Sequence, residues 1–186
     1  VAGSLGVLLG GLSAYLGGAA DIVLQRLVDV FLGVPFLVFC IVFVVILTPS
    51  VLSVGLALAF VLTPQVVRMT RGVVLPLLHR PYIEAARLAG ASTGSVLLRH
   101  LLPNAAPPIV AHLTSLFGTA VTAEASLSFL GLGIPPPYPS LGRMLREGAG
   151  LFLEAAPWLS IFPGLALTVI VGTVTLAGDR LSRSRP

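Results

Sequence analysis

Residues that can do chemistry gather in one polar segment, Arg80–Pro108, of a chain that elsewhere avoids charge. Glu84 carries a carboxylate three residues before Arg87, and Gly90 follows three residues later. A carboxylate acts as a general base only beside a group whose proton it can take, and no nucleophile or metal ligand stands beside Glu84. The pattern therefore favours an orienting or binding role for Glu84 over catalysis.

The other reactive side chains do not form a catalytic or metal-binding set. His79, His100 and His112 lack the spacing that metal ligands share, and they fit packing or interfacial positions better. Cys40 is the single cysteine, so it can form no disulfide within the chain. We therefore expect no catalysis by this chain, and no metal or cofactor bound to it.

The elements that position the polar segment are suited to lipid. Of 186 residues, 56% are hydrophobic and 10% are charged, and the mean hydropathy is +1.02; a soluble domain carries about 25% charged residues. A bilayer core needs roughly 20 mostly apolar residues per helix. Five windows meet this need: residues 1–20, two passes within 30–67 with a turn at 48–50, 101–123 and 155–178. We predict an all-α membrane helix bundle with about five transmembrane helices, in a single domain over residues 1–186.

Some features of these windows predict local structure. Gly6 and Gly10 lie four residues apart, a spacing that lets two helices approach closely in lipid. Pro35 is expected to bend the second span. The segment 21–30 places Asp21, Arg26 and Asp29 on a short amphipathic connector at the membrane surface.

The arginines predict the orientation of the chain. One side of the membrane would hold the following basic residues: Arg26, Arg68, Arg71, Arg80, Arg87, Arg99, Arg180, Arg183 and Arg185. The other side would hold only Arg143 and Arg146, accompanied by Glu147 and Glu154. Because cytoplasmic loops are enriched in basic residues, the first group predicts the cytoplasmic side. The net charge of +4 is thus explained by topology, and no nucleic-acid partner is expected.

The first residue is Val1, which lies directly inside an apolar window. This start leaves no room for the charged region of a signal peptide. We therefore expect an upstream segment with at least one more helix.

The polar segment itself predicts two short helices. Pro81 can begin the first, and Gly90 can end it with a left-handed cap. Ser92 or Thr93 can cap the second, which would end before Pro103. A helix of two to three turns is unstable alone in water, so the first helix needs a partner surface. A groove of another protein suits its alanine-lined face; lipid headgroups are the alternative.

Residues of the polar segment and of a later stretch resemble those of a known family. The sequence Glu84-Ala85-Ala86, then Gly90, and the later His100, Leu102 and Pro103 resemble the EAA loop of ABC importer permeases. The stretch SLSFLGLGIPPP at 126–137 resembles the dipeptide, oligopeptide and nickel branch, and the chain is similar to its second subunit, the C type. The resemblance runs from Leu5 to the C-terminus.

The resemblance implies partners and site residues. The family loop, here residues 80–103, is a cytoplasmic coupling segment that docks on an ATPase subunit. Its docking residues would be Tyr82, Glu84, Ala85, Ala86, Arg87 and Gly90. Supporting positions would be His100, Leu102, Pro103 and Asn104, where Asn104 is also expected to cap the next span. ATP and Mg would bind the ATPase subunits, and a homologous second permease subunit would complete the path.

The stretch 126–137 would lie on the external side. Its signature residues are Ser126, Leu127, Ser128, Phe129, Leu130, Gly131, Leu132 and Gly133. The prolines that follow exclude a regular helix. The loop would either shape the mouth where an extracytoplasmic solute-binding protein delivers cargo, or serve the fold alone. The implied function is half of an import path for di- or oligopeptides or a related small solute, in the inner membrane. An ATP-independent secondary transporter or channel is the alternative, and copurification with an ATPase would separate the two.

Overall fold

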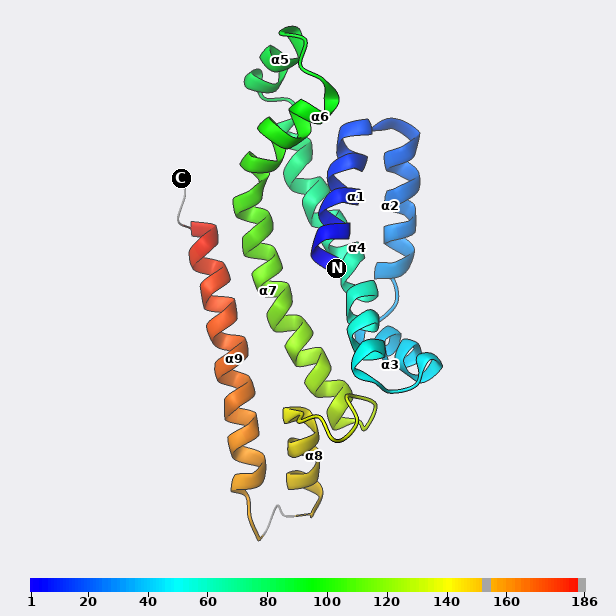
Figure 1. Ribbon diagram of the computed structural model, residues 1–186, viewed down its shortest axis with the longest axis vertical. Helices are drawn as coiled ribbons and strands as arrows, with labels where there is room; N and C mark the ends of the chain where they lie inside the picture. The colour runs from blue at the N-terminus through cyan, green and yellow to red at the C-terminus, as the bar shows by residue number, and fades with distance from the viewer. Residues whose placement is uncertain (152–154, 184–186) are drawn as a thin grey trace. The chain divides into compact units, whose positions relative to one another are not determined.

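The computed structural model describes residues 1–151 and 155–183 (Figure 1). Two charges used to predict the orientation, Glu154 and Arg185, lie outside these residues. The described chain is helical and contains no strand, which confirms the all-α prediction. Its helices are α1 (Ala2–Leu16), α2 (Gly18–Leu32), α3 (Phe36–Leu47), α4 (Val51–Leu77), α5 (Pro81–Leu88), α6 (Thr93–Ser95), the π-helical η1 (Val96–Leu101), α7 (Leu102–Phe129), α8 (Leu141–Leu151) and α9 (Trp158–Arg183).

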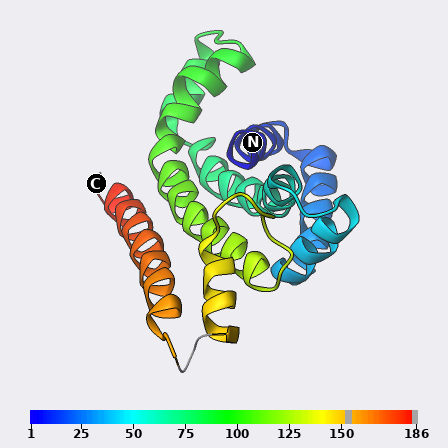
Figure 2. The same ribbon diagram turned by 60° about the horizontal axis from the view of Figure 1, so that its bottom comes forward.

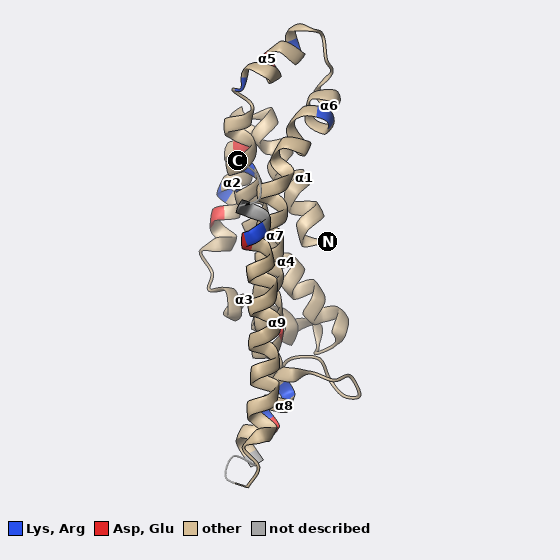
Figure 3. Cartoon of the chain, turned by 90° about the vertical axis from the view of Figure 1, so that its left-hand side faces the viewer, with Lys and Arg blue, Asp and Glu red and all other residues tan. Residues whose placement is uncertain are grey.

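Fewer helices could cross a membrane than the sequence predicted. By length and composition, α4 and α9 qualify among the described residues, and α2 with α3 adds one more if this broken pair forms one span. The prediction of about five spans is therefore not met. α1 is apolar but has only 15 residues. α7 is long enough, but hydroxyl residues, prolines, His112 and Glu124 lower its hydropathy. Figure 3 shows α9 free of charge along most of its length.

The described chain divides into two compact units. The first unit comprises Val1–Gly33, Leu62–Leu113 and the residues from Gly178 on; the second comprises Val34–Val61 and Thr114–Ala177. The prediction of a single domain over the whole chain stays a prediction. Because each unit has its own buried cluster, we describe each by itself.

The first unit is built on close contact between α1 and α4. A Cβ atom added to Gly6 would overlap Val66, and one added to Gly10 would overlap the carbonyl oxygen of Val67. The predicted close approach at these glycines is therefore present. Gly17 and Gly18, with φ of 61° and 58°, adopt the positive φ that glycine tolerates, where the chain turns from α1 into α2. The buried cluster gathers Ala14, Val74, Leu78, Ile83, Val96, Leu101, Ala105 and Ile109.

Two ion pairs join α2 to α4 within the first unit. Asp21 accepts hydrogen bonds from Arg71 Nε at 2.7 Å and from Nη2 at 2.6 Å, and Arg68 pairs with Asp29. The helix runs beyond the charge-free window 30–67, because α4 continues to Leu77 and carries both arginines. The acidic residues of α2 neutralise them, which makes the longer helix compatible with its apolar surroundings.

The second unit places α8 beside α9. The two helices run side by side in both ribbon views (Figures 1 and 2). Gly148 makes this possible, since a Cβ atom there would lie 2.8 Å from the Leu159 carbonyl oxygen. A separate buried cluster contains Cys40, Val44, Val54, Ala57, Val61 and Leu127. Pro35 stands between α2 and α3, so it marks a complete break in the helix rather than a bend.

Candidate functional site

The polar segment forms the short helix α5, with the predicted start and end. Pro81 occupies its first turn, where the missing N–H has no partner to lose. Gly90 has φ of 79°. The Ala91 N–H donates to the Ala86 carbonyl at 3.0 Å, and the Gly90 N–H donates to the Arg87 carbonyl at 3.0 Å. This pair of bonds is a Schellman motif, so the predicted left-handed cap is confirmed.

One side chain anchors α5 to the first unit. Ile83 is fully buried and packs in the cluster with Val74, Leu78, Val96 and Leu101. Its burial contributes about 2 kcal/mol. An eight-residue helix gains too little from its own backbone bonds, so this contact holds α5 in place.

The outward face of α5 is more apolar than the sequence analysis recognised. Leu88 is 90% exposed and Tyr82 is 39% exposed. Glu84, Ala85 and Arg87 are also exposed, whereas Ala86 is half-buried. Leu88 faces outward because Ile83 takes the inward position on this short helix. The exposed side of α5 thus presents a leucine and a tyrosine beside a carboxylate.

Glu84 and Arg87 do not pair with each other. Glu84 lies in the first turn of α5, where its charge is favourable to the helix dipole, and it forms no ion pair with any described residue. The Arg87 guanidinium lies over the ring of Tyr15, 5.4 Å from the centroid. The carboxylate therefore remains available at the surface.

The residues after α5 depart from two predictions. Ser92 is an N-cap and accepts from the Ser95 N–H at 3.4 Å, as one of the two predicted caps. The second short helix does not end before Pro103, because η1 leads directly into α7. An N-cap residue precedes its helix, whereas Asn104 lies inside α7 and is therefore not its cap. The Asn104 side-chain amide instead donates to the His100 carbonyl at 2.5 Å.

The supporting positions therefore share one continuous helical stretch. His100 lies in the last turn of η1, and Leu102 and Pro103 begin α7. Leu101, which the sequence analysis did not single out, is the fully buried residue of this group. Leu101 lies about one helical turn from both Val96 and Ala105. The sequence analysis did not recognise this spacing, because it expected a helix to end before Pro103.

The residues Gly90–Gly94 spell G-x-S-x-G, a pattern found around nucleophilic serines. That reading requires a strand before the serine. Here the helix α5 precedes it, and Ser92 serves as an N-cap. The segment is therefore a helix boundary.

The signature residues divide between a helix and a turn. Ser126, Leu127, Ser128 and Phe129 form the last turn of α7, while Leu130, Gly131, Leu132 and Gly133 follow it. The expectation that all eight form a loop is wrong. Gly131 has φ of 86° and ends α7 with the same bond pattern as Gly90, through Leu132 N–H to Leu127 O at 2.9 Å and Gly131 N–H to Ser128 O at 3.1 Å.

The proline stretch is non-helical, as predicted, and is tied back by side chains. Arg143 donates to the carbonyl oxygens of Ile134 at 3.1 Å and of Tyr138 at 2.7 Å. The Glu124 carboxylate accepts from Ser128 at 2.6 Å and from Ser140 at 3.2 Å. Glu124 therefore serves the fold of this loop. Tyr138, 57% exposed, remains at its surface.

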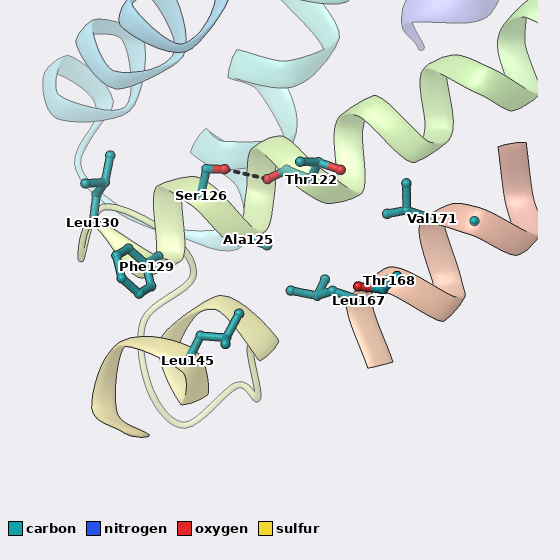
Figure 4. A pocket seen from close by; sticks show the side chains of 10 residues that line it. Thr122, Ala125, Ser126, Phe129, Leu130, Leu145, Leu167, Thr168 and Val171 are labelled. Carbon is teal, nitrogen blue, oxygen red and sulfur yellow. Dashed lines mark hydrogen bonds between the residues drawn. The ribbon is translucent and has the colours of Figure 1, made fainter. Parts of the chain in front are cut away.

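A pocket of about 700 Å³ lies within the second unit (Figure 4). Residues of α7, α8 and α9 line it, and none of the lining residues is charged. Thr122, Ser126 and Thr168 bring hydroxyl groups to this mostly apolar lining. Each hydroxyl donates to the carbonyl four residues earlier, at 3.0, 2.8 and 2.9 Å respectively, which leaves its oxygen able to accept. Such a pocket suits an uncharged group that donates hydrogen bonds.

Within the described residues, no three His, Cys, Asp or Glu side chains are placed to hold a metal ion. The polar chemistry of the chain is instead in helix caps, ion pairs and an exposed carboxylate. These features bind and orient: where a described hydroxyl donates to a carboxylate, as Ser128 does to Glu124, the pair helps to fix the end of α7 and the loop after it.

Comparison with known proteins agrees on one family. Residues 6–184 match the family described as binding-protein-dependent transport system inner membrane component. The chain is 39% identical over 178 residues to the dipeptide transport system permease protein DppC of Haemophilus influenzae, with coverage of 96% of this chain and 60% of that protein. It is 38% identical over 177 residues to the glutathione transport system permease protein GsiD of Pectobacterium atrosepticum, with coverage of 95% and 58%.

A solved structure shares the fold. The chain superimposes on a chain of the MetNI methionine ABC transporter in an inward-facing conformation, with a TM-score of 0.75 and 23% identity. The match covers 98% of this chain and 88% of that one. The chain spans about three fifths of the length of the curated relatives that it matches.

Proposed function

Since the chain belongs to the family of binding-protein-dependent transport system inner membrane components, we propose that it forms one half of the translocation path of an ATP-driven importer. Two such permease subunits would enclose the path. ATP and Mg would bind separate ATPase subunits in the cytoplasm, and this chain would hydrolyse nothing itself.

The geometry of α5 carries this proposal. A helix of eight residues is held by one buried isoleucine and turns Leu88 and Tyr82 outward. An exposed leucine and a partly exposed aromatic ring on one short helix are suited to anchoring it in a hydrophobic groove on a partner. The exposed Glu84 would then meet a cationic group of the ATPase at the edge of that groove. Lipid contact would not require the carboxylate.

We place α5 and the C-terminus on the cytoplasmic side. Arg80, Arg87 and Arg99 are exposed in and around α5, and basic residues concentrate on the cytoplasmic side of membrane proteins. The loop after α7 would then face outward and meet a solute-binding protein through its exposed tip at Tyr138.

For the cargo we propose di- or oligopeptides or a related small solute. The curated relatives are described as permeases for dipeptides and for glutathione, and both kinds of molecule contain amide N–H groups. The pocket of the second unit would accept hydrogen bonds from such groups through Thr122, Ser126 and Thr168. Its lack of charge would allow cargo of varied side chains to pass.

Copurification tests the proposal directly. The full-length permease, its partner permease and the ATPase subunits are coexpressed, and a tag on this chain recovers the complex. Leu88→Asp places a charge at the proposed anchor, so the recovered ATPase should fall about tenfold or more, as for loss of a hot spot. Leu98→Asp is the matched control, because Leu98 is 67% exposed but lies in η1.

Two outcomes would contradict the docking role of α5. In one, Leu88→Asp recovers as much ATPase as the unaltered protein. In the other, the two aspartate variants lose the ATPase equally, which would show that any exposed charge in this region has the same effect.

A further inference from the structure

Tyr15 links the last turn of α1 to both sides of the turn that ends α5. Its ring faces the Arg87 guanidinium at 5.4 Å, and its hydroxyl donates to Thr93 Oγ1 at 3.4 Å. Gly90 lies between these two partners in the chain. Tyr15 also packs against the buried cluster that contains Ile83. One side chain therefore contacts the coupling helix, the segment after it and the core beneath it.

The end of α1 that carries Tyr15 is itself firmly held. Ser13 donates to Asp21 Oδ1 at 3.1 Å, and the same carboxylate accepts two bonds from Arg71 of α4. Further back, Gly6 and Gly10 press α1 against α4. Tyr15 thus projects from a helix that is fixed to its neighbours at several points.

α5 has one other strong attachment. Ile83 is the single fully buried residue of this helix, and it lies near its start. One buried contact permits rotation of a short helix about that contact. A second contact at Arg87, in its last turn, removes this freedom.

We propose that Tyr15 is a positioning residue that fixes the orientation of α5 and carries its movement into α1 and α4. This inference rests on the proposed function, in which an ATPase grips α5. The guanidinium lies over the ring, where the cation–π attraction holds the last turn of α5 against α1 and opposes its displacement. Tyr15 does not belong to the outward face formed by Tyr82 and Leu88.

This position separates binding of the ATPase from transmission of its movement. Without the Tyr15 ring, α5 would still present its exposed face and would still bind. The helix would turn about Ile83 when the ATPases close, so less of the movement would reach α1. ATP hydrolysis would then continue with less cargo moved.

The test uses the complete importer in proteoliposomes and measures cargo uptake, ATP hydrolysis and bound ATPase. Tyr15→Leu removes both contacts, and we expect the ATP hydrolysed per cargo molecule to rise about tenfold, within the usual range of coupling between sites. Bound ATPase should stay within about twofold of the unaltered complex. Tyr15→Phe keeps the ring and loses only the hydroxyl, so it should retain most of the coupling. Leu12→Ala, an exposed position one turn earlier on α1, should change neither quantity.

A double-mutant cycle shows whether Arg87 is the partner. If Tyr15 acts through the guanidinium, the double variant Arg87→Gln with Tyr15→Leu should hydrolyse no more ATP per cargo molecule than the more affected single variant. Arg87→Lys keeps the positive charge, so it should couple ATP hydrolysis to uptake better than Arg87→Gln does. Independent, multiplying effects would overturn the inference, and so would Tyr15→Leu with an unchanged ratio of ATP to cargo.

The outcomes also distinguish this inference from the proposed function. If the unaltered complex shows no ATP-driven uptake, the proposed function fails. If uptake is normal, Leu88→Asp abolishes it and Tyr15→Leu does not raise the ratio, only the inference fails. Should Tyr15→Leu not assemble, Arg87→Gln decides: a raised ratio of ATP to cargo would support the ring contact, and an unchanged ratio would overturn the inference.

Discussion

The ends of α5 and α7 share one backbone geometry and differ in what the side chains do. Gly90 and Gly131 both close a Schellman motif with positive φ. After Gly131 the chain is tied to itself through Glu124 and Arg143. Near Gly90, Arg87 and Thr93 contact Tyr15, but Leu88 is 90% exposed and no described residue covers it.

The comparison shows that a distinctive sequence motif need not form an exposed surface. The stretch 126–137 is the more distinctive motif, yet the structure accounts for several of its residues by internal packing: Leu127 is fully buried, and a Cβ on Gly133 would overlap Ser128. The common residues of α5 leave an apolar face without a cover in the described chain. Residues of the signature stretch are thus engaged in internal packing, whereas the exposed face of α5 is open to the partner that we propose.

The largest expected effect concerns the close packing near the signature stretch. A Cβ on Gly142 would overlap the backbone carbonyl of Ala125, which cannot move as a side chain can. Gly142→Ala should lower the free energy of unfolding by about 3 kcal/mol. Gly150→Ala, in the same helix with no atom within 4 Å of the added Cβ, should be neutral or slightly stabilising. Denaturant unfolding in detergent compares the two, and equal stabilities would contradict the tight packing.

A smaller effect follows from the two helix ends themselves. A side chain at positive φ costs about 1–2 kcal/mol, so both Gly90→Leu and Gly131→Leu are strained. At Gly131 the new side chain would also meet Arg146, whereas nothing lies within 4 Å at Gly90. Thermal unfolding should therefore show the greater loss for Gly131→Leu. Gly90→Leu should leave the protein inserted and uncouple ATP hydrolysis from uptake; normal transport by this variant would reject the role of its cap.

The smallest effect concerns the exposed carboxylate of α5. Glu84→Lys reverses a favourable charge near the helix start, a change worth about 0.3–1 kcal/mol for the isolated helix. The fold should therefore survive, while docking to a cationic partner weakens and uptake falls. Uptake and ATPase recovery measured at low and high salt check this, because an ion pair at the protein surface is screened. Glu84→Gln is the control, and wild-type uptake by Glu84→Lys would exclude the pairing.

The local features of α5 were predictable because they depend on residues close in sequence. Pro81 and Gly90 fix its ends through backbone constraints that one residue imposes on its own turn. The glycine pair Gly6 and Gly10 was predictable for the same reason. The sequence did not reveal which side of α5 faces inward, since Ile83 and Leu88 are both apolar.

Features that depend on distant residues were missed or misjudged. Arg71 pairs with Asp21 across 50 residues, and no local pattern announces it. Without these pairs, a charge after Val67 suggested the end of a span, although α4 continues. The π-helical turn at 96–101 removed the expected break before Pro103. The link between Tyr15 and Arg87 also required the three-dimensional structure.

The central claim is that α5 is gripped by an ATPase from the cytoplasm. The most direct measurement places a photo-crosslinking side chain at Leu88 of the full-length permease in assembled membranes. The account predicts an adduct with the ATPase subunit, together with labelling of Arg80→Cys only from the cytoplasmic side. Adducts with lipid alone, or labelling of that cysteine from outside the cell, would contradict it.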